Sequence, residues 1–133
     1  MEPILQVQNL NYIYSIGTPF EHKALEDVSF SVNRGEFIGI IGHTGSGKST
    51  LMQQLNGLLK PTSGQVHVNG FNLEHIRKRD IPHMRRTLGV VFQDFRLINK
   101  MTVYDNVAYA MRVIGAREAE IRERVPYVLE LVG

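Results

Sequence analysis

Residues 42–50 read Gly-His-Thr-Gly-Ser-Gly-Lys-Ser-Thr and directly follow an apolar run. Their spacing is that of the phosphate-binding loop, G-x-x-x-x-G-K-[ST], which joins a strand to a helix. Gly42, Gly45 and Gly47 allow backbone N–H groups to turn inward toward an anion. A helix that begins at Lys48 adds free N–H groups and the positive end of its dipole. The segment therefore predicts an α/β fold with a nucleoside triphosphate site.

The side chains of this loop supply the remaining groups that a triphosphate needs. Lys48 can reach the β- and γ-phosphates as a mobile positive charge, and the Ser49 hydroxyl is the expected Mg²⁺ ligand. Thr50 adds a second hydroxyl near the phosphates. The predicted phosphate-binding residues are Gly42, His43, Thr44, Gly45, Ser46, Gly47, Lys48, Ser49 and Thr50.

Composition limits the other kinds of site. A chain of 133 residues is long enough for a single domain with a sizeable core. The absence of cysteine excludes a disulfide framework and thiolate sites, and the five histidines are scattered, so no metal beyond Mg²⁺ is indicated. No apolar stretch approaches the roughly 18 residues that span a bilayer, and the N-terminus does not resemble a signal peptide. We expect a cytoplasmic chain.

Positive charge is concentrated in the second half of the chain. Residues 1–70 hold four basic and five acidic residues, for a net charge of −1, whereas residues 71–133 hold eleven and eight, for +3. Asp80 and Glu74 interrupt the basic cluster, and no aromatic residues interleave to stack bases, which favours a solvated helical face over a nucleic-acid or anionic-lipid surface. The cluster consists of Arg77, Lys78, Arg79, Arg85 and Arg86.

Strands and helices are expected to alternate along the chain. Alternating and continuous apolar patterns predict strands over residues 4–10, 28–32, 37–41, 65–69 and 88–92, the third and fifth being buried. Arg34-Gly35 and Asn69-Gly70 are turn signals. Helical spacing covers residues 48–58, 102–114 and 117–132.

Two residues bear on the ends and continuity of these helices. Thr102 is placed to cap the second helix, with Asp105 in its first turn. Pro126 removes a backbone hydrogen bond from the third, so we expect a kink or break near Val125.

With these elements placed, the whole chain resembles the nucleotide-binding domain of ABC-type ATPases. Tyr14 lies upstream of Lys-Ala-Leu-Glu-Asp-Val-Ser-Phe at residues 23–30, where that family places an aromatic residue that stacks on adenine. Tyr12 is a nearby competitor for this role. The run Val-Val-Phe-Gln-Asp at 90–94 resembles the family's Q-loop, in which Gln93 would offer an amide oxygen to Mg²⁺ or to the attacking water.

The resemblance implies an ABC-type P-loop NTPase fold with a β-rich N-terminal subdomain, a RecA-like core and the start of a helical subdomain. We expect this domain to be truncated within the helical subdomain. Residues 1–92 would be part of the nucleotide-binding core, and 93–133 the Q-loop and helical start. ATP and Mg²⁺ are the implied cofactors. The implied partners are a second ABC ATPase domain and an integral membrane subunit at the inner face of the membrane, the latter contacting Phe95, Arg96, Leu97 and Ile98.

The two halves of the chain resemble different ABC subfamilies. Residues 1–70 are similar to energy-coupling-factor ATPases of the vitamin and cobalt importers, whereas the sequence from Leu73 onward resembles the cell-division ABC ATPase. Either the chain has a crossover near residues 68–73, or the assignment of one half to its subfamily is wrong.

The resemblance implies that several motifs of the family lie beyond residue 133: the signature motif, the Walker B aspartate with its catalytic glutamate, and the switch histidine. Because phosphoryl transfer depends on positioned water and charge stabilisation, this chain alone is predicted to bind ATP without hydrolysing it. Its last helix is expected to expose Val128, Leu129, Leu131 and Val132. The alternatives are a non-hydrolytic nucleotide-binding fragment and a soluble DNA-associated ABC ATPase.

Overall fold

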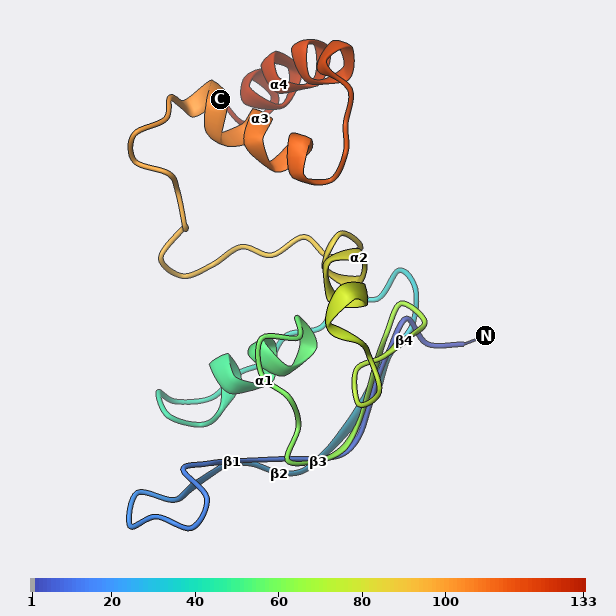
Figure 1. The fold of residues 1–133 in the computed structure, drawn as a ribbon, viewed down its shortest axis with the longest axis vertical. Helices are drawn as coiled ribbons and strands as arrows, with labels where there is room; N and C mark the ends of the chain where they lie inside the picture. The colour runs from blue at the N-terminus through green and yellow to red at the C-terminus, as the bar shows by residue number, and fades with distance from the viewer. Residues whose placement is uncertain (1) are drawn as a thin grey trace. The chain divides into compact units, whose positions relative to one another are not determined.

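The structure, a computed structural model, describes residues 2–133 (Figure 1). They fall into two compact units, one ending at Gly89 and the other spanning Val90–Gly133. The first unit contains β1 (Leu5–Tyr14), β2 (His22–Val32), α1 (Lys48–Leu55), β3 (Ser63–Val68), β4 (Phe71–Asn72), the 3₁₀ helix η1 (Lys78–Asp80) and α2 (Ile81–Arg85). The second contains α3 (Val103–Val113) and α4 (Glu118–Val132).

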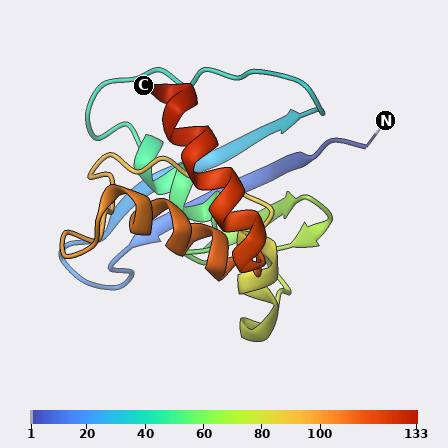
Figure 2. The same cartoon turned by 90° about the horizontal axis from the view of Figure 1, so that it is seen from above.

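An antiparallel sheet of order β2-β1-β3-β4 organises the first unit. Figure 2 shows β1 and β2 running side by side, and both strands are longer than their alternating patterns predicted. Val7 of β1 lies opposite Phe30 of β2 and Val66 of β3. The Asn69-Gly70 turn is confirmed: both residues have positive φ, 48° and 86°, as a two-residue hairpin turn between β3 and β4 requires.

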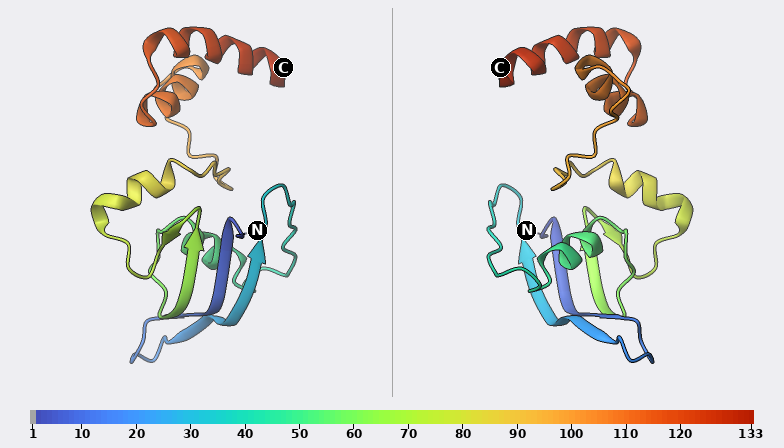
Figure 3. Two further views of the ribbon diagram at one scale, coloured as in Figure 1. Left: turned by 90° about the vertical axis from the view of Figure 1, so that its right-hand side faces the viewer. Right: turned by 90° about the vertical axis from the view of Figure 1, so that its left-hand side faces the viewer.

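The core of this unit forms where α1 covers one face of the sheet (Figure 3). Inward-facing strand residues meet Leu51 of α1 there, and each large apolar side chain that is fully buried contributes about 1.5–3 kcal/mol. The buried members are Val7, Leu10, Leu25, Leu51, Val66, Val68, Leu73 and Met84.

Helix α1 ends at Leu55, three residues earlier than predicted. Gly57, with φ of +77°, donates from its N–H to the carbonyl oxygen of Gln54, and Leu58 donates to that of Gln53. This pair of bonds is the Schellman motif, in which a left-handed residue satisfies the last helical carbonyls and turns the chain away.

The predicted buried strands at residues 37–41 and 88–92 are not formed. Phe37 is 99% exposed, Ile41 96% and Val91 93%, whereas Leu88 at the start of the second run packs against the first unit's core. A strand exists only when a neighbouring backbone pairs with it, and among residues 2–133 no segment pairs with either run. An apolar run identifies a segment suited to a sheet interior, but its pairing is decided elsewhere in the fold.

The second unit is a pair of helices packed around Ala108, Ile121 and Val125. The predicted cap is confirmed, because the Thr102 hydroxyl accepts a hydrogen bond from the backbone N–H of Asp105 at 3.0 Å. None of the helices within residues 2–133 has the length and apolar character needed to cross a membrane.

Helix α4 runs from Glu118 to Val132 without interruption (Figure 2), so of the predicted kink or break near Val125 the break is not formed. Pro126 is exposed while Val125 is fully buried, so the packing of Val125 holds the helix across the missing backbone bond. Leu131 and Val132 are exposed as predicted, whereas the Val128 and Leu129 side chains are half-buried.

Candidate nucleotide-binding site

The glycine-rich loop turns tightly into α1. Ser46 donates from its N–H to the carbonyl oxygen of His43 at 3.2 Å, and Gly47 caps the helix with φ of +98°. A Cβ at Gly47 would lie 2.6 Å from the carbonyl oxygen of Ala24 on β2. The end of the loop therefore rests directly on the sheet backbone, which only glycine permits at this φ.

The start of α1 leaves backbone donors free. The first helical hydrogen bond runs from the N–H of Leu51 to the carbonyl oxygen of Gly47 at 2.9 Å, and no side chain caps the helix. The N–H groups of Lys48, Ser49 and Thr50 precede that bond and have no partner within the helix. Three free N–H groups at the positive end of a helix fit an anionic phosphate.

Lys48 folds back over the loop. Its Nζ donates to the carbonyl oxygen of Gly42, to that of His43 at 2.9 Å and to the Ser46 hydroxyl at 3.3 Å. The ammonium group thus ties the beginning of the loop to the helix. It also places a positive charge on the loop, where a triphosphate would need it.

Tyr14, at the end of β1, reaches α1 through its hydroxyl, which lies 3.0 Å from the Thr50 hydroxyl. The Tyr12 ring meets the Tyr14 ring edge to face, with centroids 4.7 Å apart and an interplanar angle of 79°. Tyr12 packs against the hydrophobic core instead. Of the two tyrosines proposed from the sequence, Tyr14 is the one bonded to the phosphate-loop helix.

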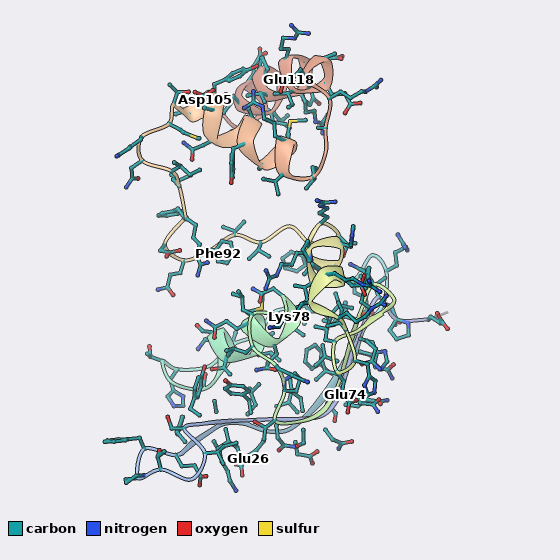
Figure 4. All side chains as sticks on the ribbon, in the orientation of Figure 1. Glu26, Glu74, Lys78, Phe92, Asp105 and Glu118 are labelled. Carbon is teal, nitrogen blue, oxygen red and sulfur yellow. The ribbon has the colours of Figure 1, made fainter. Side chains whose placement is uncertain are left out.

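Gln93 belongs to the second unit, where it is exposed in a sharply turned segment. Phe95 and Arg96 both have positive φ, 60° and 48°, which is rare for side chains of this size. The Arg96 guanidinium lies 4.3 Å from the ring centroid of Phe92, which is labelled in Figure 4, and its Nε is 3.6 Å from an Asp94 oxygen. These contacts hold the turn that follows Gln93.

Asn106 on α3 anchors the chain after this turn, a role that the sequence did not reveal. Its Oδ1 accepts from the N–H of Ile98 at 2.8 Å. Its Nδ2 donates to the carbonyl oxygens of Ile98, Met101 and Thr102 at 3.2, 3.3 and 2.9 Å. No local pattern marks an asparagine as the anchor of a segment eight residues away, so only the folded chain shows it.

A model of the family described as "ABC transporter" matches residues 25–133. The chain belongs to the ABC transporter family. It is 44% identical over 131 residues to the energy-coupling factor transporter ATP-binding protein EcfA2 of Caldanaerobacter subterraneus subsp. tengcongensis, covering 97% of this chain and 45% of the relative. It is 47% identical over 130 residues to the cell division ATP-binding protein FtsE of Streptococcus pneumoniae serotype 2, covering 98% and 55%.

Solved ABC structures share the fold. The dimeric post-hydrolysis state of the ATP-binding cassette MJ0796, bound to ADP and Pi, has a TM-score of 0.85 and 30% identity, covering 95% of this chain and 56% of that one. The cbiO1 protein of Clostridium perfringens, part of the ABC transporter complex cbiONQ, has a TM-score of 0.79 and 37% identity, covering 98% and 50%. The predicted α/β, ABC-type P-loop NTPase fold is confirmed. The chain spans about half the length of the curated relatives it matches.

Both subfamilies suggested by the two halves occur among the ABC relatives, and EcfA2 and FtsE each align with nearly all of this chain. The region around the suggested crossover is continuous in structure. Leu73 donates from its N–H to the carbonyl oxygen of Val66 at 2.9 Å and is buried in the same core as Val68. The suggested crossover thus lies within the β3–β4 hairpin of the first unit.

The basic cluster of this ABC domain is partly committed to internal contacts. The Arg77 Nε donates to Asp80 at 2.9 Å, and the Arg85 Nε donates to the carbonyl oxygen of Asn56 at 3.1 Å. The side chains of Lys78, Arg79 and Arg86 are exposed. Because Arg77 and Arg85 are engaged in contacts within the chain, the cluster supports the solvated-surface interpretation over a nucleic-acid surface.

Proposed function

We propose that this chain binds Mg²⁺-ATP at residues 42–50 and serves as the ATP-binding part of an ABC-type system. The observation that carries the proposal is a glycine-rich loop tied to Lys48 through the His43 carbonyl oxygen and followed by three N–H groups of α1 that have no partner within the helix. In this proposal the loop holds the phosphates and Tyr14 stacks on the adenine. Ser49 and Gln93 supply oxygen ligands to Mg²⁺, which prefers such donors.

The proposed partners are a second ATP-binding domain and an integral membrane subunit at the inner face of the membrane. Support for the first comes from MJ0796, which is a dimer, and support for the second from cbiO1, which is part of a transporter complex. The proposed membrane-subunit contact lies at Phe95, Arg96, Leu97 and Ile98. Phe95 and Leu97 are 73% and 65% exposed, and Asn106 fixes the backbone that presents them.

Two systems remain candidates for the membrane partner, energy-coupling-factor import and cell division, as the names of the relatives suggest. Co-purification of the chain with each class of membrane subunit would distinguish them. A Leu97→Asp variant should lose the true partner, because a carboxylate would be buried without a counter-charge. A matched Lys100→Asp variant, outside the proposed contact, should retain it.

Calorimetric titration of the 133-residue chain and its Lys48→Ala variant with Mg²⁺-ATP tests the nucleotide site. The variant should lose most of its triphosphate affinity while its circular dichroism spectrum stays unchanged, because it removes the loop's only lysine charge. Equal affinity in both proteins would reject the site.

A phosphate-release assay tests the further proposal that the chain alone binds ATP without turnover. Sustained phosphate release by the parent chain that is abolished in Lys48→Ala would contradict this proposal.

A further inference from the structure

We propose that Thr50 is a positioning residue for Tyr14, so that one pair of hydroxyl groups links recognition of the base to recognition of the phosphates. This inference rests on the proposed nucleotide site. Its structural basis is the 3.0 Å hydrogen bond between Tyr14 Oη and Thr50 Oγ1, which joins the end of β1 to the first turn of α1 across 36 positions of sequence.

The bond lies in a protected place. Thr50 is only 8% exposed and Tyr14 is half-buried, so water competes weakly for either hydroxyl. The ring of Tyr14 is held at a second point by the edge-to-face contact with Tyr12, whose own ring packs against the core. A ring fixed at two points loses little further freedom when a base stacks on it, and this pre-organisation favours binding.

The hydroxyl of Thr50 can connect Tyr14 to a bound phosphate, because it can accept one hydrogen bond and donate another. Thr50 has one O–H donor and two acceptor lone pairs, so it can accept from Tyr14 while donating its own proton to a phosphate oxygen. When a phosphate oxygen accepts the hydrogen bond from the Thr50 hydroxyl, only Tyr14 can donate in the bond between the two hydroxyl groups. The resulting chain, from Tyr14 through Thr50 to phosphate, strengthens each bond by polarisation. Phosphate binding would therefore hold the tyrosine more firmly in place.

A double-mutant cycle with two ligands tests the link. Tyr14→Phe keeps the ring and removes the hydroxyl, and Thr50→Val keeps the shape of Thr50 and removes its hydroxyl. Titration of the 133-residue chain with Mg²⁺-ATP and with Mg²⁺-tripolyphosphate, which has no base, separates recognition of the base from recognition of the phosphates. Tyr109→Phe, in the second unit, is the matched control for loss of a tyrosine hydroxyl.

Tyr14→Phe should weaken ATP binding about 3- to 10-fold, the range for loss of one hydrogen bond. It should weaken tripolyphosphate binding by less, because that ligand loses only the polarisation of the Thr50–phosphate bond. In the Thr50→Val background the same change should have no further effect on ATP. Equal effects of Tyr14→Phe in both backgrounds, equal weakening of both ligands, or no effect on ATP would each overturn the inference. Failure of the parent chain to bind either ligand would instead reject the nucleotide site.

Discussion

Arg85 donates a hydrogen bond from its Nε to the backbone carbonyl oxygen of Asn56, 3.1 Å away. A second bond runs from its Nη2 to the carbonyl oxygen of Gly57 at 3.3 Å. Both carbonyls lie at the C-terminal end of α1, where the helix dipole is negative, so the guanidinium supplies donors and a complementary charge together. A residue that the sequence placed in a basic surface cluster thus joins α2 to the helix that carries the phosphate loop.

Replacement of Arg85 should therefore destabilise the first unit. We expect Arg85→Ala to lower the free energy of unfolding by about 1–2 kcal/mol, since it removes two charge-assisted bonds at a partly exposed site. Urea denaturation followed by circular dichroism measures the change. Arg86→Ala removes a neighbouring exposed cation and should stay within about 0.5 kcal/mol of the parent. Equal losses in the two variants would mean that the contacts of Arg85 contribute nothing.

Gly64 and Gly70 provide a matched pair for separating steric from conformational strain. Both have positive φ, +92° and +86°, but only Gly64 is crowded: a Cβ there would collide with the carbonyl group of Asn9, its carbon 2.6 Å away. Gly70→Ala should cost about 1 kcal/mol, the price of a left-handed alanine. Gly64→Ala should cost at least about 2 kcal/mol more, because the obstacle is backbone of β1 that cannot rotate away. Thermal unfolding of both variants measures the two losses of stability. Equal losses would contradict the close approach of β1 to β3 at Gly64.

Gln54 of α1 is fully buried, and neither atom of its amide has a hydrogen-bond partner among residues 2–133. An unpaired buried amide costs about 1–3 kcal/mol. We therefore expect Gln54→Met, a change of similar length, to raise the free energy of unfolding by about 1 kcal/mol. The neighbouring half-buried Gln53 is the control, and Gln53→Met should change stability little. A clear loss of stability in Gln54→Met would show that the amide is satisfied in solution.

The Arg112–Glu118 pair gives the second unit a pH-dependent contact between α3 and α4. The two side chains approach to 2.9 Å, and the hydrogen bond from Arg112 lowers the pKa of Glu118 below its ordinary value of 4.5 (Glu118 is labelled in Figure 4). A lowered pKa in the folded state means that this contribution is fully present above pH 4.5 and is lost as the pH falls through the lowered value.

An NMR titration of the Glu118 carboxyl carbon tests this contact. Arg112→Gln should raise the pKa of Glu118 toward its ordinary value, because the charged donor is gone. Arg117→Gln is the control, since the Arg117 guanidinium pairs with Glu120 instead, at 2.8 Å, and should leave the pKa of Glu118 in place. High salt should weaken the shift, as expected for exposed partners. Identical titration curves in the parent and Arg112→Gln would contradict the pairing.

Local signals in the sequence were sufficient wherever the structure depends on a few adjacent residues. Three features depend on backbone dihedral angles or bonds within four residues: the glycine pattern of residues 42–50, the Asn69-Gly70 turn and the Thr102 cap. Each could therefore be predicted from adjacent residues alone. The same residues, together with the resemblance they carry, were enough to predict the family that the comparisons confirm.

Tertiary structure alone decided the contacts between distant segments. The apolar run at residues 37–41 has the composition of a buried strand, yet it is unpaired here because pairing requires a second backbone that its own residues cannot specify. Likewise, Tyr12 and Tyr14 are alike in sequence, and only the packing of α1 on the sheet directs one into the core and the other to Thr50. Sequence determined the local geometry of the phosphate loop, and long-range packing determined which side chains surround it.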